Sequence, residues 1–186
     1  MLRRNLSITL IATTISVVLC TLGFNPETQP LDSIAVIWPG AILQAFAGAL
    51  FGGWGVVATV LAGLVADILL AGTVHASIGY ILPDLLQALI PAWYYRHRIA
   101  QYGWTAPTFH FWPFFIFSIL ISNIVGAVTA TCIFQFYLSH EFHFWFPLMR
   151  WLVANIPIAL LLGWPLFRYL GPTLAQEGLV MRGWWQ

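Results

Sequence analysis

The sequence predicts an all-α membrane protein, a single domain over residues 1–186 that folds as a bundle of six transmembrane helices. Apolar residues make up 60% of the chain and charged residues only 7%, whereas an ordinary soluble domain carries about 25% charged residues. The mean hydropathy is +0.85. Six spans of roughly 20 residues would use about 120 residues and leave only short loops. So few charges cannot cover a soluble globule, which excludes a soluble enzyme, a disordered chain and a nucleic-acid binder.

The elements follow one another with short connections. The predicted spans cover residues 6–24, 33–51, 54–71, 77–95, 111–138 and 146–170. Turn-forming, glycine-rich or polar residues separate them at positions 25–32, 52–53, 72–76, 101–110 and 139–143. The basic pair Arg3 and Arg4 precedes the first span. We expect that span to remain uncleaved, because no small-residue cleavage site of the A-x-A type follows it.

The arginines predict the orientation of the bundle. If the N-terminus is cytoplasmic, the inner side receives six of the seven cationic side chains: Arg3, Arg4, Arg96, Arg98, Arg168 and Arg182. Cytoplasmic loops carry such an excess of positive charge. The cluster from Arg96 to Arg98 is expected to end the fourth span on that side. Both termini are therefore expected in the cytoplasm of a bacterial cell, with the chain in the plasma (inner) membrane.

Small residues recur at every fourth position of the second span, at Ala41, Ala45 and Ala49. This spacing places them on one helix face, where two helix backbones can approach closely. Two interpretations stay open. The face packs against the third span within the bundle, or it is a surface on which a partner membrane protein docks.

Polar side chains within the spans are the candidate site. Ionisable groups in a bilayer are costly and indicate function by default; here they are Asp67, Asp84 and Arg150. Gln87 shares a helix face with Asp84, and Asn155 lies a little deeper than Arg150. In the predicted topology all five lie in the outer half of the membrane. Either Arg150 forms a structural ion pair with one of the carboxylates, or the five line an outward-facing pocket for a small solute.

Three further features border this layer. Trp38 and Trp145 lie at depths where they can cap a ligand, and the loop 25–32 is a candidate lid. Asn123, near the middle of the fifth span, is expected to make an interhelical hydrogen bond. The proposed pocket therefore opens outward between the third, fourth and sixth spans.

No catalytic constellation is recognised in the sequence. The run His140-Glu141-Phe142-His143 places its histidines three residues apart, whereas the H-E-x-x-H zinc motif places them four apart. No glycine-rich phosphate loop is present in the sequence, which excludes an ATPase. We expect no enzyme, no metal site and no cofactor.

One stretch carries a resemblance to a known family. The run from Trp38 to Gly55, continuing through Ala62 to Asp67, resembles the substrate-binding (S) components of energy-coupling factor transporters. In that family an apolar helix ends in a glycine turn and leads into a small-residue helix closed by an acidic residue. The resemblance implies a membrane subunit that captures a vitamin or micronutrient. It would pass this small solute to a partner transmembrane subunit and two ATPases.

The family's docking motif on the first helix is Ala-x-x-x-Ala. This chain offers Ala12, Ser16 and Cys20 at that spacing, so a serine replaces the second alanine. An alternative is a sensory input protein that signals through a separate chain. The run Ile37-Trp38-Pro39 and the arginine-terminated fourth span are similar to membrane-associated sensor domains. Only residues 171–186 follow the last predicted span, which favours solute capture over sensing.

Overall fold

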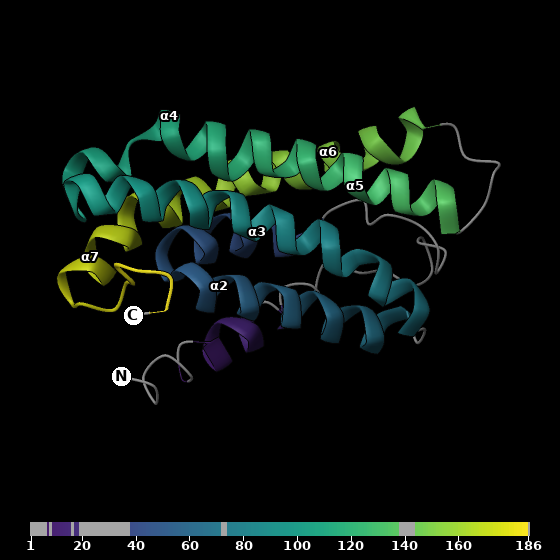
Figure 1. Ribbon diagram of the computed structural model, residues 1–186, viewed down its shortest axis with the longest axis horizontal. Helices are drawn as coiled ribbons and strands as arrows, with labels where there is room; N and C mark the ends of the chain where they lie inside the picture. The colour runs from purple at the N-terminus through teal and green to yellow at the C-terminus, as the bar shows by residue number, and fades with distance from the viewer. Residues whose placement is uncertain are drawn as a thin grey trace.

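The computed structural model describes Ser7, residues 9–15, 17–18, 38–71, 74–137 and 144–185. All regular elements in these residues are helical (Figure 1). The elements are α2 (Gly40–Ala71), α3 (Val74–Tyr102), η1 (Ala106–Phe109), α4 (Phe111–Pro113), η2 (Phe114–Ile121), α5 (Ser122–Tyr137), α6 (Trp145–Ile158), η3 (Ala159–Gly163), η4 (Leu166–Leu170) and α7 (Gly171–Gln176). The all-α prediction is confirmed for the described part of the chain.

Helix α2 consists of two segments, residues 40–51 and 53–71, that fold back on each other at Gly52. The φ of Gly52 is 57° and its ψ is −133°, a conformation that glycine adopts without the steric cost of a Cβ. A Cβ added to Gly55 would overlap the carbonyl oxygen of Ala47, although residues eight apart in a straight helix are separated by about 12 Å. The turn therefore falls at the predicted glycine pair.

The first segment of α2 is the centre of the molecule. Every residue from Pro39 to Gly53 is buried, as expected for a helix that is apolar on all sides. It packs against α3, against η3 and α6, and against η2. Its alanines share one hydrophobic cluster with large side chains of these neighbours, among them Tyr95, Phe114 and Phe167.

Helix α3 is longer than the sequence predicts at both ends. It begins at Val74, inside the predicted loop 72–76, and ends at Tyr102, past the arginine cluster that was expected to terminate it. Arg96 is 5% exposed, so it is buried in the protein and does not project into the cytoplasm. Arg96 can be buried because its guanidinium donates to backbone carbonyls of other segments, described below.

The two remaining long helical stretches, 111–137 and 145–176, contain π-helical segments. Pro113 directly precedes η2, Pro157 lies two residues before η3, and Pro165 directly precedes η4. Proline has no N–H for the regular helical ladder. Local π geometry lets neighbouring N–H and C=O groups find new partners without ending the helix. The fifth and sixth predicted spans therefore remain helical despite their prolines.

By length and composition, three helical stretches of the described residues are apolar enough to cross a membrane: Gly40–Ala66, Phe111–Ile133 and Trp145–Gln176. The first of them contains the reversal at Gly52 and is not one straight helix. The exterior agrees with a lipid environment. In the second segment of α2 the exposed side chains Val57, Leu61, Val65 and Ile68 form an apolar stripe at helical spacing. The chain thus has the features of a membrane protein. The count of six spans and the cytoplasmic termini stay predictions.

Candidate functional site

Four buried polar side chains connect three helical segments at the centre of the bundle. The Nε2 of Gln44, on the first segment of α2, donates a hydrogen bond of 2.7 Å to Oδ1 of Asp84 on α3. The Nε2 of Gln87, one turn further along α3, donates a 2.7 Å hydrogen bond to Oδ1 of Asn123 on α5. Asn123 in turn donates to the backbone oxygen of Ile119. We call these four residues the polar chain.

Two glycines make room for the polar chain. A Cβ added to Gly63, on the second segment of α2, would overlap Oδ2 of Asp84. A Cβ added to Gly126, on α5, would lie 2.5 Å from Cγ of Gln87. At Gly63 and at Gly126 the added Cβ would lie closer to its neighbour than real Cβ atoms do. The helices can therefore approach Asp84 and Gln87 this closely only because neither position carries a side chain.

The polar chain retains unused hydrogen-bonding capacity. The Oε1 atoms of Gln44 and Gln87 are buried and have no hydrogen-bond partner in the described residues, and the same holds for Nδ2 of Asn155 and Nε1 of Trp151 on α6. A buried polar group without a partner costs about 1–3 kcal/mol. Such groups require an explanation. Free acceptors on two helices and free donors on a third are suited to a small polar solute.

The structure brings together two of the predicted site residues, Asp84 and Gln87. Asn155 is also buried, on α6. Arg150 is half-buried, and its guanidinium carbon lies 6.0 Å from the ring centroid of Phe146. The ion pair of Arg150 with Asp84 or Asp67 stays a prediction. The side chain of Asp67 lies outside the described residues.

The proposed caps have different surroundings. Trp38 is half-buried against the central cluster. Its main-chain N–H donates a 3.4 Å hydrogen bond to the main-chain oxygen of Ala154. Trp145 is exposed, so it does not cover the polar chain. The candidate lid 25–32 lies outside the described residues.

The alanine face of the second predicted span is not available to a partner. Ala41, Ala45 and Ala49 are 0–2% exposed and belong to the central cluster. This face is packed inside the bundle, so its assignment as a docking surface is wrong. The large side chains of its cluster, Tyr95, Phe114 and Phe167, come from α3, η2 and η4 and not from the third predicted span. On the first helix Ala12 is half-buried, and its neighbour Thr13 donates a hydrogen bond to the oxygen of Ala58. Ser16 lies outside the described residues.

Sequence reasoning placed Asn123 correctly in an interhelical hydrogen bond but missed Gln44. The available signal was the position of Gln44 as a polar residue between Ala41 and Ala45 in an otherwise apolar run. An amide in such a run has no water to bond, so it needs a partner on a neighbouring helix. Asp84 is that partner.

Comparison with known proteins adds no relative: no family model, no curated protein and no solved structure matches this chain.

We expect Gly63→Ala to lower the free energy of unfolding by about 1–3 kcal/mol, because the added methyl overlaps the carboxylate of Asp84. Thermal unfolding in detergent measures the loss. Gly163→Ala is the matched control, since its Cβ would make ordinary contacts of 3.8 Å. If the clash with Asp84 is the cause, Gly63→Ala costs clearly less in an Asp84→Ala background. An equal cost in both backgrounds would contradict this account.

Proposed function

We propose that this chain is a multi-pass protein of the bacterial plasma membrane that captures a small polar solute for uptake. It would act as an S component-like subunit, binding a vitamin or micronutrient and handing it to a partner transmembrane subunit energised by ATPases. The observation that carries the proposal is the polar chain, whose buried Oε1 atoms on Gln44 and Gln87 have no hydrogen-bond partner in the described residues.

A purely structural polar chain would use its hydrogen-bonding groups fully, because each unpaired one destabilises the fold. Here the two glutamines each spend one amide hydrogen on a neighbouring helix and leave the carbonyl oxygen unused. A solute that donates hydrogen bonds to the glutamine oxygens would complete the arrangement.

The other predicted site residues receive secondary roles in this proposal. Asn155 has a buried, unpaired amide nitrogen and would donate to an acceptor on the solute. Arg150, at the half-buried start of α6, would attract an anionic group as the solute enters. Trp38 and Asp67 stay predicted contributors to solute binding. Partner docking would use a surface other than the buried alanine face.

The test is native mass spectrometry of the protein extracted gently from its host membranes. We expect a bound small molecule of defined mass in the wild-type protein. Gln87→Leu should remove that mass from protein that still unfolds cooperatively, although its melting temperature should fall, because Oδ1 of Asn123 loses its donor. Gln135→Leu, at an exposed position of α5, should retain it.

Two outcomes would overturn the proposal. In the first, the wild-type protein carries no bound small molecule and co-purifies with a kinase or cyclase, which would favour the sensory function. The other is a bound molecule that survives in Gln87→Leu, which would place the site away from the polar chain.

A further inference from the structure

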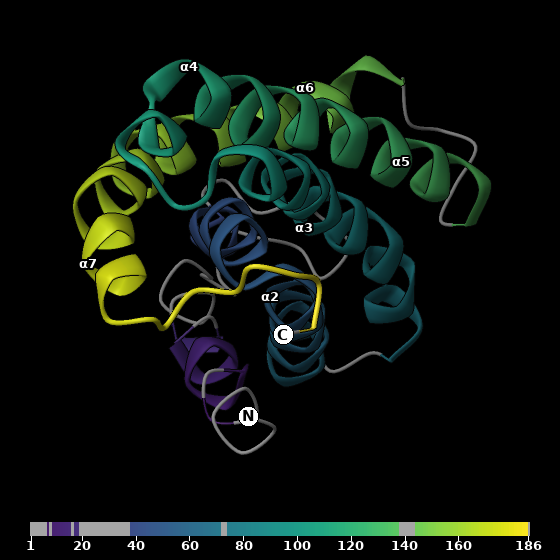
Figure 2. The same ribbon diagram turned by 60° about the vertical axis from the view of Figure 1, so that its left-hand side comes forward.

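The C-terminal segment, residues 179–185, lies across the reversal of α2 (Figure 2). Main-chain hydrogen bonds hold it there. The N–H of Met181 donates to the oxygen of Leu50 over 2.9 Å, and the N–H of Gly53 donates to the oxygen of Trp184 over 2.8 Å. These bonds use a carbonyl at the end of the first helical segment and an amide at the start of the second. Both groups lack intrahelical partners at a helix end.

The buried guanidinium of Arg96 ties α3 to the same place. Its Nη2 donates to the oxygen of Ala49, and its Nη1 donates to the oxygens of Met181 and Gly183. The guanidinium carbon lies 5.5 Å from the ring centroid of Trp104. A buried charge must be compensated by hydrogen bonds, and here two of the three acceptors come from the C-terminal segment.

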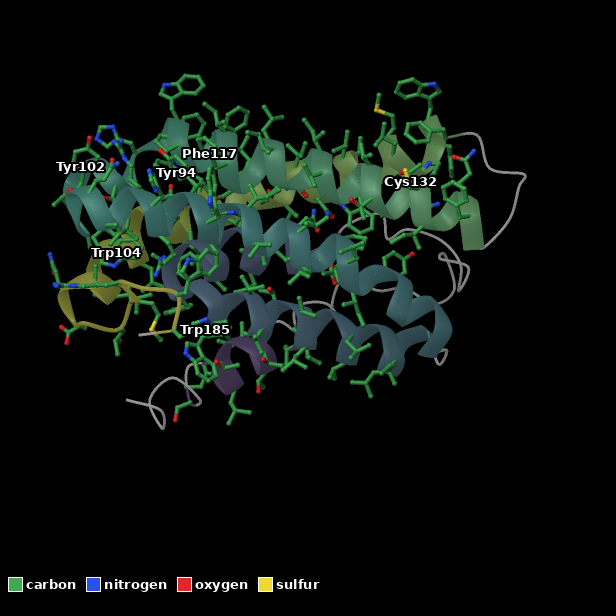
Figure 3. All side chains as sticks on the ribbon, in the orientation of Figure 1. Tyr94, Tyr102, Trp104, Phe117, Cys132 and Trp185 are labelled. Carbon is green, nitrogen blue, oxygen red and sulfur yellow. The ribbon has the colours of Figure 1, made fainter. Side chains whose placement is uncertain are left out.

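Tryptophan side chains extend the contact. The indole N–H of Trp104 donates to the oxygen of Met181, and that of Trp54 donates to the oxygen of Trp185, each over 3.3 Å. The ring of Trp185 covers Gly53, where a Cβ would lie 2.7 Å from it. Trp104 and Trp185 both lie toward the end of the molecule opposite Cys132 (Figure 3). Val180 and Met181 are the buried apolar anchors of the segment.

The segment leaves α7 at a glycine hinge. The N–H of Leu179 donates to the oxygen of Leu174, and the N–H of Gly178 donates to the oxygen of Ala175. This pair of bonds is a Schellman motif, which ends a helix at a left-handed glycine. Gly178 has a φ of +67°, and a Cβ added there would meet nothing within 4 Å. The backbone can therefore change direction at Gly178 without disturbing a packed neighbour.

We propose that residues 179–185 are a releasable latch that fixes the first segment of α2. When the latch is docked, its carbonyl oxygens hold Arg96, Trp54, Trp104 and the amide of Gly53. When it is released, water at this end of the molecule takes over those donors, and the central segment that carries Gln44 is free to shift. The latch is a property of this end of the fold and holds whatever solute the polar chain binds.

The geometry supports release more than permanent burial. The hydrogen bonds described above that join the segment to α2, Arg96 and Trp104 use its main chain, so water or another peptide can replace them. Only Val180 and Met181 are buried, whereas Leu179, Arg182 and Trp185 are exposed. Trp184 is half-buried against the cluster of Val56, Ala88 and Ala92. Three apolar contacts and one open hinge describe a docked peptide more closely than part of a helical core.

The test uses the full chain with a protease site inserted after Gly178, so that the protein folds before the latch is cut. Hydrogen exchange is measured by mass spectrometry in lipid nanodiscs, before and after cleavage and dilution. We expect the released peptide to dissociate and the amides of residues 41–54 to exchange about tenfold faster or more. The amides of α5, which does not touch the latch, should not change.

A synthetic peptide of residues 178–186 should restore the protection, and the same peptide with Val180→Asp and Met181→Asp should fail to do so. The proposal is overturned if the peptide dissociates without any rise in exchange at residues 41–54. It is also overturned if exchange rises equally in α5, because the segment would then be part of the core. If the cut protein aggregates, the uncut Met181→Ala variant is measured instead. The proposal then requires that hydrogen exchange in this variant rise only at residues 41–54.

Discussion

Arg96→Ala is expected to destabilise the protein by several kcal/mol, because each buried carbonyl oxygen that loses its donor costs about 1–3 kcal/mol. The substitution deletes the donor shared by Ala49, Met181 and Gly183. These carbonyl oxygens belong to two segments that no other described side chain joins in this way. The first segment of α2 and the C-terminal segment should therefore loosen together. Thermal unfolding in detergent, with hydrogen exchange of residues 41–54, measures both effects.

Arg98→Ala is the matched control. Arg98 lies two residues further along α3, is half-buried, and has its guanidinium carbon 4.7 Å from the ring centroid of Tyr102. A surface contact of this kind contributes about 0.5–1 kcal/mol, so the control should lose little stability. Arg96→Lys should restore only part of the loss, because an ammonium group cannot reach carbonyls on two sides as the planar guanidinium does. Equal losses for Arg96→Ala and Arg98→Ala would refute the buried-guanidinium account.

The sequence permits prediction of the helical class and of the turn at Gly52, because apolar runs and a glycine pair act locally. It also permits prediction that Asp84 and Gln87 face one interior, since residues three apart share a helix face. The partners of these side chains could not be predicted. Gln44 meets Asp84 because α2 folds back and lies against α3, and that geometry depends on contacts far apart in the chain.

Arg96 is a second residue whose surroundings could not be predicted from the sequence. By sequence it belongs to a basic cluster beyond a span, where cytoplasmic arginines are usual. In the structure Arg98 is half-buried beside the ring of Tyr102, whereas Arg96 turns inward to main-chain carbonyls of the C-terminal segment. Carbonyl groups occur at every residue and leave no mark in the sequence. A buried arginine compensated by them cannot be distinguished from an exposed one without the fold.

Gly48→Ala is expected to disrupt the centre of the bundle, with a loss of about 3 kcal/mol or more, at the upper end of what overpacking costs. A Cβ at this position would overlap the carbonyl oxygen of Ala88 on α3 and lie 3.3 Å from Cγ of Pro91. The first of these atoms is main chain and cannot rotate away. The two helices would have to separate, one turn from both Gln44 and Asp84, so the hydrogen bond between those side chains should be lost as well.

Gly79→Ala makes the same chemical change in α3 but adds a Cβ that meets only Cγ2 of Ile133, at 3.3 Å. A side-chain methyl can yield by a few tenths of an ångström, so this variant should melt within a few degrees of the wild-type protein. A similar loss in both variants would show that helical glycines in this chain are simply intolerant of a Cβ. A large loss confined to Gly48→Ala would show that close approach of α2 and α3 is what holds the polar chain together.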